Sequence, residues 1–197
     1  MRSVLAMVSA IGVMVAVSGV LPVEQMLVGV SIAAPKKQAK VLAVGDDAPK
    51  LQVSTWIKGQ PVNGIDKGKV YVVEFWATWC GPCRESIPHL TKTQKDNKDV
   101  IVIGVASYER KPKSGSDDRK AKLEKFVKDQ GDKMNYRVAF ETDDKMGSAW
   151  MDAAKQEGIP TAFIVGGDGK IAYIGSPHGG SFDAALKSAV EASKKGG

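Results

Sequence analysis

The chain has 197 residues, of which 43% are hydrophobic and 25% are charged, values typical of a globular protein that buries its own core. Its 28 lysines and arginines outnumber its 22 aspartates and glutamates, which gives a formal net charge of +6 at pH 7. Because the two signs are interleaved and no basic helix with aromatic residues is evident, the charge does not indicate nucleic-acid binding. The length fits one domain and a targeting segment.

The N-terminus carries a long uncharged segment. After Arg2, residues 3–23 are mostly Val, Ala, Met, Leu and Ile, a composition typical of a signal peptide or a membrane anchor. Ser31 and Ala33 are small residues at the positions expected before a cleavage site. We therefore predict that residues 1–34 direct export, either as a cleaved signal peptide or as a membrane tether.

A polar segment separates this N-terminus from the remainder. Residues 35–44 contain three lysines and are predicted to be a solvated linker. The composition then changes, and residues 45–197 are predicted to form the folded domain. An exported chain of this kind is expected to be periplasmic or otherwise extracytoplasmic.

The first half of the domain contains two buried strands and a helix between them. Residues 51–57 alternate well enough for a strand, and the turn at residues 59–61 is expected to lead to another short extended piece. Residues 70–77 form a near-continuous run of β-branched and aromatic side chains, which predicts a central strand buried on both faces. A helix is expected to begin near Pro82, and residues 100–105 to form a second, parallel strand.

The second half adds further helices and strands around the same sheet. Helices are predicted from apolar residues at helical spacing around residues 123–127, 146–154 and 182–193. Strands are predicted at residues 136–140, 161–165 and 171–174. The last two strands are joined by a glycine-rich turn and are expected to pair antiparallel. Trp150 belongs to the middle helix and is expected to be a core residue.

The chain has only two cysteines, Cys80 and Cys83, and they lie two residues apart. This excludes a framework of several disulfides and a zinc site with four thiolates. Thiol-disulfide exchange needs one thiolate to attack and a second thiol to release the mixed disulfide. Cys80 precedes the predicted helix, whose free N–H groups favour a thiolate, so we predict that Cys80 attacks and Cys83 resolves. We expect no metal and no cofactor besides the redox-active Cys80–Cys83 disulfide.

The run at residues 74–84 resembles the active-site stretch of the thioredoxin superfamily. Pro88 and the Gly-Ile-Pro-Thr sequence at residues 158–161 make it more similar to TlpA/ResA-like thiol-disulfide reductases. The similarity extends over about residues 45–191. It implies an α/β, thioredoxin-like fold, in which a central mixed β-sheet is flanked by helices and has extra strands at its N-terminal side.

The same resemblance implies where a client protein binds. In the family, a cis-proline loop faces the dithiol and receives the extended client backbone, and Ile159 and Pro160 match that loop. Trp79 beside the dithiol is expected to offer an apolar surface to the client. Gly81 and Pro82, between the cysteines, complete the implied client-binding residues.

Glu74 lies six residues before Cys80, where thioredoxins carry a buried acid behind the resolving cysteine. Burial would raise its pKa and suit it to exchange a proton with Cys83. The alternative is a carboxylate at the rim of the sheet with an ordinary salt bridge. Many ResA-like proteins also have a glutamate three residues after the second cysteine, but this chain has Ser86 there and Glu85 one place earlier, so that role does not carry over. The histidines, His89 and His178, have no metal-ligand spacing and are expected to be solvated or hydrogen-bonded.

The resemblance implies an exported protein-disulfide reductase. Its implied clients are proteins with disulfides, such as apocytochrome c during cytochrome c maturation or copper-site proteins, and its implied partner is a membrane electron donor. One alternative is a peroxiredoxin-like thiol peroxidase, but the usual Thr-x-x-Cys spacing is not met, because only Trp79 separates Thr78 from Cys80. The other alternative is a non-catalytic binding module in which the cysteine pair is structural or binds a metal.

Overall fold

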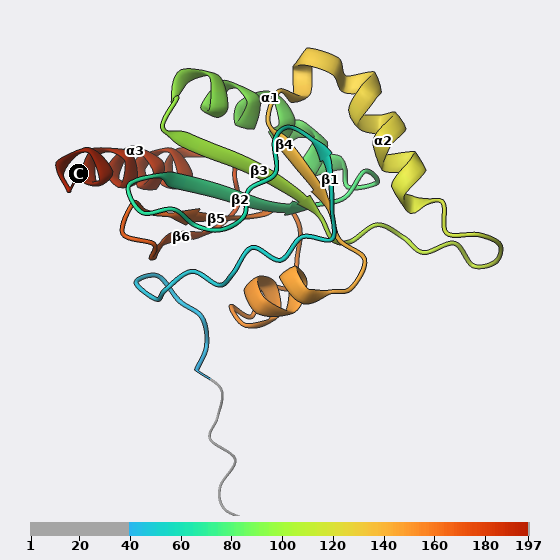
Figure 1. The fold of residues 1–197 in the computed structure, drawn as a ribbon, viewed down its shortest axis with the longest axis horizontal. Helices are drawn as coiled ribbons and strands as arrows, with labels where there is room; N and C mark the ends of the chain where they lie inside the picture. The colour runs from blue at the N-terminus through green and yellow to red at the C-terminus, as the bar shows by residue number, and fades with distance from the viewer. Residues whose placement is uncertain (1–39, 197) are drawn as a thin grey trace, which may run out of the picture. The chain divides into compact units, whose positions relative to one another are not determined.

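Residues 40–196, which the computed structural model describes, build one six-stranded mixed sheet in the order β1-β4-β3-β2-β5-β6 (Figure 1). The predicted export segment lies outside the described residues. The strands are β1 (Thr55–Lys58), β2 (Val70–Trp76), β3 (Val100–Ala106), β4 (Arg137–Phe140), β5 (Thr161–Val165) and β6 (Ile171–Gly175). The helices are α1 (Gly81–Asp96), α2 (Arg119–Gln130) and α3 (Gly180–Lys195), with a 3-10 turn η2 (Gly131–Met134) and a π-helix η3 (Gly147–Asp152).

Strand β2 occupies the middle of the sheet, and every one of its residues is buried. It pairs in parallel with β3, from Val70 opposite Val100 to Trp76 opposite Ala106, and antiparallel with β5. Its β-branched and aromatic side chains suit a strand that is covered on both faces. The predictions of a central strand at 70–77 and of a parallel neighbour at 100–105 are confirmed.

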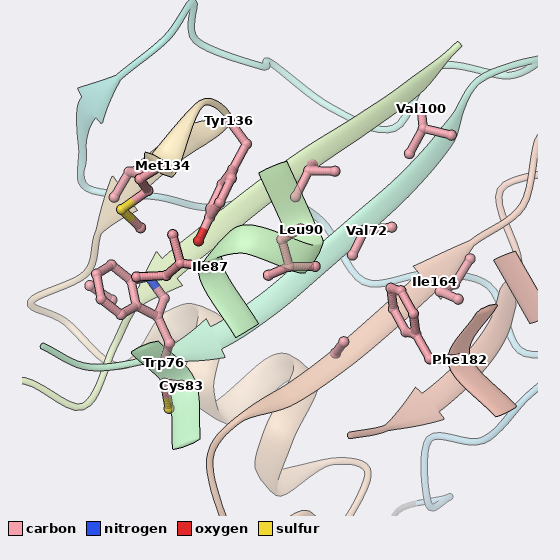
Figure 2. Close-up of a cluster of buried hydrophobic side chains, with 14 of the residues drawn as sticks. Val72, Trp76, Cys83, Ile87, Leu90, Val100, Met134, Tyr136, Ile164 and Phe182 are labelled. Carbon is pink, nitrogen blue, oxygen red and sulfur yellow. The ribbon is translucent and has the colours of Figure 1, made fainter. Parts of the chain in front are cut away.

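A hydrophobic cluster lies on each face of the sheet. Val72 and Trp76 of β2 point to the face that α1, α2 and α3 cover, and they pack there with Ile87 and Leu90 of α1 (Figure 2). The intervening residues of β2 point to the opposite face, which η3 and the segment before β1 cover. Trp150 of η3 is fully buried in this second cluster, as predicted.

The structure differs from the predictions at three elements. The strand predicted at residues 51–57 is limited to Thr55–Lys58. Only β1 precedes β2 as an additional strand, and the extended piece expected after the turn at 59–61 forms no strand within residues 60–69 of the described chain. The middle helix of the second half is a π-helix rather than an α-helix. Both types of helix bury one face at similar spacing, so the apolar pattern does not distinguish them.

The chain before Gly45 already contacts the domain. The N–H of Leu42 donates to the carbonyl oxygen of Ala153 at 2.8 Å, and the Leu42 side chain packs against the cluster around η3. The described part of the segment predicted as a linker therefore includes residues that are attached to the fold. Within residues 40–196, no helix is long and apolar enough to cross a membrane.

Gly104 gives a test of packing at the middle of the sheet, because it lies opposite Glu74 in the β2–β3 register. A Cβ at this position would lie 3.0 Å from Nε1 of Trp76 and 3.1 Å from Cε2 of Tyr136, both in buried side chains. We expect Gly104→Ala to lower the free energy of unfolding by about 1–3 kcal/mol, measured by urea denaturation. In the control, Gly64→Ala, the added Cβ meets no atom within 4 Å, so a change below about 0.5 kcal/mol is expected. Equal stability of the two variants would contradict this account.

Candidate active site

The two cysteines lie where β2 passes into α1. Cys80 caps the helix with an extended backbone, and its Sγ accepts the N–H of Cys83 at 3.2 Å. Pro82 occupies the first turn, where a helix leaves its N–H groups unpaired, so the missing donor costs no helical hydrogen bond. Cys80 and Cys83 form a disulfide with their Cα atoms 5.3 Å apart. The predicted helix start is confirmed.

The two sulfurs differ in access and in electrostatic setting. Cys83 is fully buried, whereas Cys80 is 4% exposed. Cys80 also lies at the N-terminus of a 16-residue helix that has no acidic residue in its first turn. The free N–H groups and the helix dipole therefore act on Cys80 without a competing carboxylate and favour negative charge on its sulfur.

The loop before β5 faces the disulfide. The Ile159–Pro160 peptide bond is cis, as the resemblance implied, and the carbonyl oxygen of Ile159 lies 3.8 Å from Sγ of Cys80. A pocket of about 340 Å³ opens beside Cys80. It is lined by Trp79, Cys80, Pro82, Tyr108, Met151, Glu157, Gly158 and Ile159. Of the predicted client-binding residues, Gly81 and Pro160 are adjacent to this lining but not part of it.

A segment after β3 holds the loop that carries Trp79. The indole Nε1 of Trp79 donates to the carbonyl oxygen of Tyr108 at 2.8 Å, and the guanidinium of Arg110 lies 4.3 Å from the centre of the Trp79 ring. Thr78 donates its N–H and its hydroxyl to the two carboxylate oxygens of Glu109, at 2.6 and 2.8 Å. Trp79 remains 44% exposed in this arrangement, so part of its ring faces solvent beside the dithiol.

Tyr108, Glu109 and Arg110 are not among the site residues predicted from the sequence. The signal that would have found them is the parallel pairing of β2 with β3. Adjacent parallel strands end at the same edge of a sheet, so the residues that follow them meet. Here Trp76 and Ala106 are paired at that edge.

Glu74 lies inside the core rather than at the rim, which excludes the alternative of an ordinary surface salt bridge. It is 1% exposed, and its Oε1 has no hydrogen-bond partner. Burial raises the pKa of Glu74 to about 8, and the Ser86 hydroxyl acts in the opposite direction. Burial also holds the pKa of the Tyr136 phenol well above its usual value, and the charge of Glu74 adds to this effect.

Ser86, at the position where many ResA-like proteins have a glutamate, is fully buried and contacts a histidine from the far end of the chain. Its Oγ lies 2.9 Å from Nε2 of His178, 92 residues away, and the same nitrogen lies 3.2 Å from the carbonyl oxygen of Pro82. Glu85 is exposed, so its carboxylate does not replace the missing glutamate in the core. His178 was expected to be solvated or hydrogen-bonded, and it is hydrogen-bonded. Its position beside the helix that carries the dithiol was not predicted from the sequence.

Potential metal ligands are dispersed in the part of the chain that the structure describes. No group of three or more His, Cys, Asp or Glu residues there could hold a metal ion together. The chemistry available at this site is that of two thiols, a buried carboxyl group and the hydroxyl and imidazole beside it.

A disulfide capping the helix after the central strand, opposite a cis-proline loop, defines a thioredoxin-fold dithiol protein. Residues 43–186 match the Redoxin family, and the chain belongs to this family. It is 33% identical over 139 residues to Protein FixW of Rhizobium leguminosarum, a match that covers 70% of this chain and 62% of FixW. The chain thus spans less than two thirds of that relative.

Two further relatives support the class. The chain is 25% identical over 138 residues to the thiol-disulfide oxidoreductase ResA of Bacillus subtilis, covering 68% of this chain and 67% of ResA. A crystal structure of a thiol:disulfide interchange protein from Chlorobium tepidum superposes with a TM-score of 0.56 and 26% identity, covering 73% of this chain and 95% of that one. The resemblance to ResA-like proteins is therefore confirmed, together with the thioredoxin-like fold.

The buried carboxyl group of Glu74 predicts a dependence of stability on pH. Its folded-state pKa, about 8, lies above its ordinary value of 4.5, so the folded protein keeps a proton that the unfolded chain releases. This contribution is fully present below pH 4.5 and is lost as the pH rises to 8. Glu74→Gln stays uncharged, so we expect its unfolding free energy, relative to wild type, to rise by about 3 kcal/mol between pH 5.5 and 8.

Urea denaturation of the disulfide-bonded proteins at several pH values measures this difference. Glu85→Gln is the matched control, because Glu85 is exposed on the same helix turn as Ser86. Its stability relative to wild type is expected to change little over this pH range. A constant difference between Glu74→Gln and wild type would contradict the buried, protonated state of Glu74.

Proposed function

We propose that the chain is an exported protein-disulfide reductase that transfers two electrons from the Cys80–Cys83 dithiol to disulfides of client proteins. The observation that carries this proposal is the placement of the disulfide at the N-terminus of α1, with Cys80 at the edge of a pocket and Cys83 behind it. The names of ResA and of the Chlorobium protein support the same type of chemistry.

In the first step, the Cys80 thiolate of the reduced protein attacks one sulfur of the client disulfide. A bond forms between Cys80 Sγ and that sulfur, and the other client sulfur leaves as a thiolate. The helix N-terminus stabilises the attacking thiolate. Trp79, Pro82 and the loop of Ile159 and Pro160 form the surface on which an extended client segment lies, with Gly81 keeping the cap free of a side chain.

In the second step, Cys83 attacks Cys80 in the mixed disulfide. Glu74 in its carboxylate form takes the thiol proton of Cys83, the Cys80–Cys83 disulfide forms, and the client sulfur leaves as its second thiolate. Alternation along β2 supports this role, because Glu74 points to the same face as Val72 and Trp76, whose cluster contains Cys83. In regeneration, a donor thiolate attacks Cys80, and Cys83 leaves and takes the proton back from Glu74.

The place of action and the partners form the finer part of the proposal. The uncharged N-terminal segment at residues 3–23 supports action outside the cytoplasm, with the chain secreted or tethered to the membrane. The similarity to ResA-like proteins supports client proteins such as apocytochrome c, hence a role in cytochrome c maturation, and a membrane electron donor that returns the dithiol to its reduced state.

Cysteine variants test the two assigned roles. Cys83→Ser keeps the attacking sulfur but lacks the resolving one, so we expect it to accumulate a mixed disulfide with a model client such as insulin, seen by mass spectrometry and lost on reduction. Cys80→Ser is expected to trap no client. The rate of insulin reduction is expected to fall at least about 100-fold in both variants, the scale on which a single catalytic group contributes. Wild-type rates in both variants would support the non-catalytic alternative, and rapid peroxide consumption dependent on Cys80 would support the peroxidase.

The direction of electron flow is tested by equilibration in glutathione buffers. The Gly-Pro pair between the cysteines resembles reducing thioredoxins, so we expect a potential near roughly −270 mV rather than one near roughly −120 mV. The fraction of disulfide at each buffer ratio is measured by thiol alkylation and mass spectrometry. A potential close to the second value would contradict a reductase.

A further inference from the structure

Three polar side chains lie between the core and the surface behind the dithiol. Glu74 is 1% exposed, Ser86 is fully buried one helical turn after Cys83, and His178 is exposed before α3. The hydroxyl of Ser86 acts on the Glu74 carboxyl group, and its oxygen lies 2.9 Å from Nε2 of His178. Ser86 is thus a buried hydroxyl group that contacts an imidazole at the surface.

Burial holds the pKa of Glu74 at about 8, so at neutral pH this acid carries a proton that it must release before it can accept the proton of Cys83. Glu74 has no direct access to water, and the groups facing it differ in what they can do. The Tyr136 phenol, from the β4 side, keeps its proton because its pKa is raised. The indole of Trp76 is a donor only. The Ser86 hydroxyl of α1 both accepts and donates, and it also contacts a group at the surface.

The surroundings of His178 suit both protonation states of its Nε2. When this nitrogen lacks a proton, it accepts the Ser86 hydroxyl at 2.9 Å. When it carries one, it donates to the carbonyl oxygen of Pro82 at 3.2 Å. The Ser86 hydroxyl also lies 3.3 Å from that carbonyl oxygen, so the carbonyl accepts from either group. The other histidine near α3, His89, is instead paired with Asp183 at 3.1 Å.

We propose that Ser86 and His178 form a proton relay between Glu74 and solvent, a role that rests on the proposed function of the dithiol. On release, the Glu74 O–H bond breaks as the proton joins Ser86 Oγ, and the original hydroxyl proton of Ser86 moves to Nε2 of His178. The products are a Glu74 carboxylate, an unchanged serine and a histidine imidazolium, which gives its proton to water. The reverse sequence returns a proton to Glu74 when the dithiol is regenerated.

Ser86 and His178 are therefore positioning and proton-transfer residues that act on client reduction through Glu74. A serine in a helix often donates to the carbonyl four residues earlier, and Pro82 would satisfy Ser86 in this way without any histidine. The additional contact to His178 is what distinguishes a relay from such a local bond. This contact joins Ser86 of α1 to His178, 92 positions away. Of Glu74, Ser86 and His178, it is His178 that is exposed to water.

Single-turnover kinetics of the reduced full chain test the relay. The protein is mixed with excess insulin at low buffer concentration, and formation of the Cys80–Cys83 disulfide is followed by tryptophan fluorescence. We expect His178→Ala to slow the resolving step at least about tenfold, and added imidazole to restore most of the rate. Ser86→Ala is expected to be slowed without restoration, because the link to Glu74 is missing. His89→Ala is the matched control, expected to react at the wild-type rate with no effect of imidazole.

A second variant separates proton transfer from hydrogen bonding. His178→Gln can keep a hydrogen bond to Ser86 but cannot titrate, so it is expected to be slowed like His178→Ala. In a Glu74→Gln background, His178→Ala is expected to cause no additional slowing. A wild-type rate in His178→Gln, or slowing of His178→Ala that imidazole does not restore, would overturn the relay while the reductase remains active. A wild-type chain that does not reduce insulin would instead overturn the proposed function on which the relay rests.

Discussion

The position of the active site depends on the complete burial of β2. This strand is bonded to β3 on one edge and β5 on the other and is covered on both faces, so the point at which it leaves the sheet has little freedom. Helix α1 begins after a connection of four residues, and its packing through Ile87 and Leu90 orients its N-terminus over the end of β2. The alternation that gives β2 two apolar faces also places Glu74 under this helix.

Several polar atoms lie without partners in the same region. Oε1 of Glu74, Nε1 of Trp76 and the hydroxyl of Tyr136 are buried and make no hydrogen bond among the described residues. A buried polar group without a partner costs about 1–3 kcal/mol, so a core selected for stability alone would replace such groups by apolar ones. Their occurrence together, behind a disulfide, supports the proton transfer proposed for Glu74.

Most elements of the fold were predictable because their signals are local. Continuous apolar runs identified β2 and β3, a glycine-rich turn identified the β5–β6 hairpin, and Pro82 indicated the start of α1. The order of the strands, with β4 between β3 and β1, follows from long-range pairing and is not written in any short segment. The same limit explains the extended piece predicted after residues 59–61, which has no strand to pair with.

The residues of the site also fall into two groups, those with a local signal in the sequence and those without one. Cys80, Cys83, Glu74 and the loop of Pro160 follow from a motif and its resemblance to a family. The contacts of Glu109 with Thr78 and of His178 with Ser86 join residues that lie 31 and 92 positions apart, and each depends on how complete elements pack. Single residues of common type in loops carry no signal of such contacts. A serine where relatives have a glutamate was visible in the sequence, but its partner was not.

The order in which the parts of the site occur along the chain has a consequence for its assembly. The dithiol and α1 lie near the middle of the sequence, whereas the Ile159 carbonyl beside Cys80 and the imidazole of His178 come from its last quarter. During synthesis, the two cysteines therefore emerge well before these groups. Until β5 and the segment that carries His178 have joined the fold, the dithiol lacks the carbonyl oxygen and the imidazole that lie beside it and α1 in the finished site.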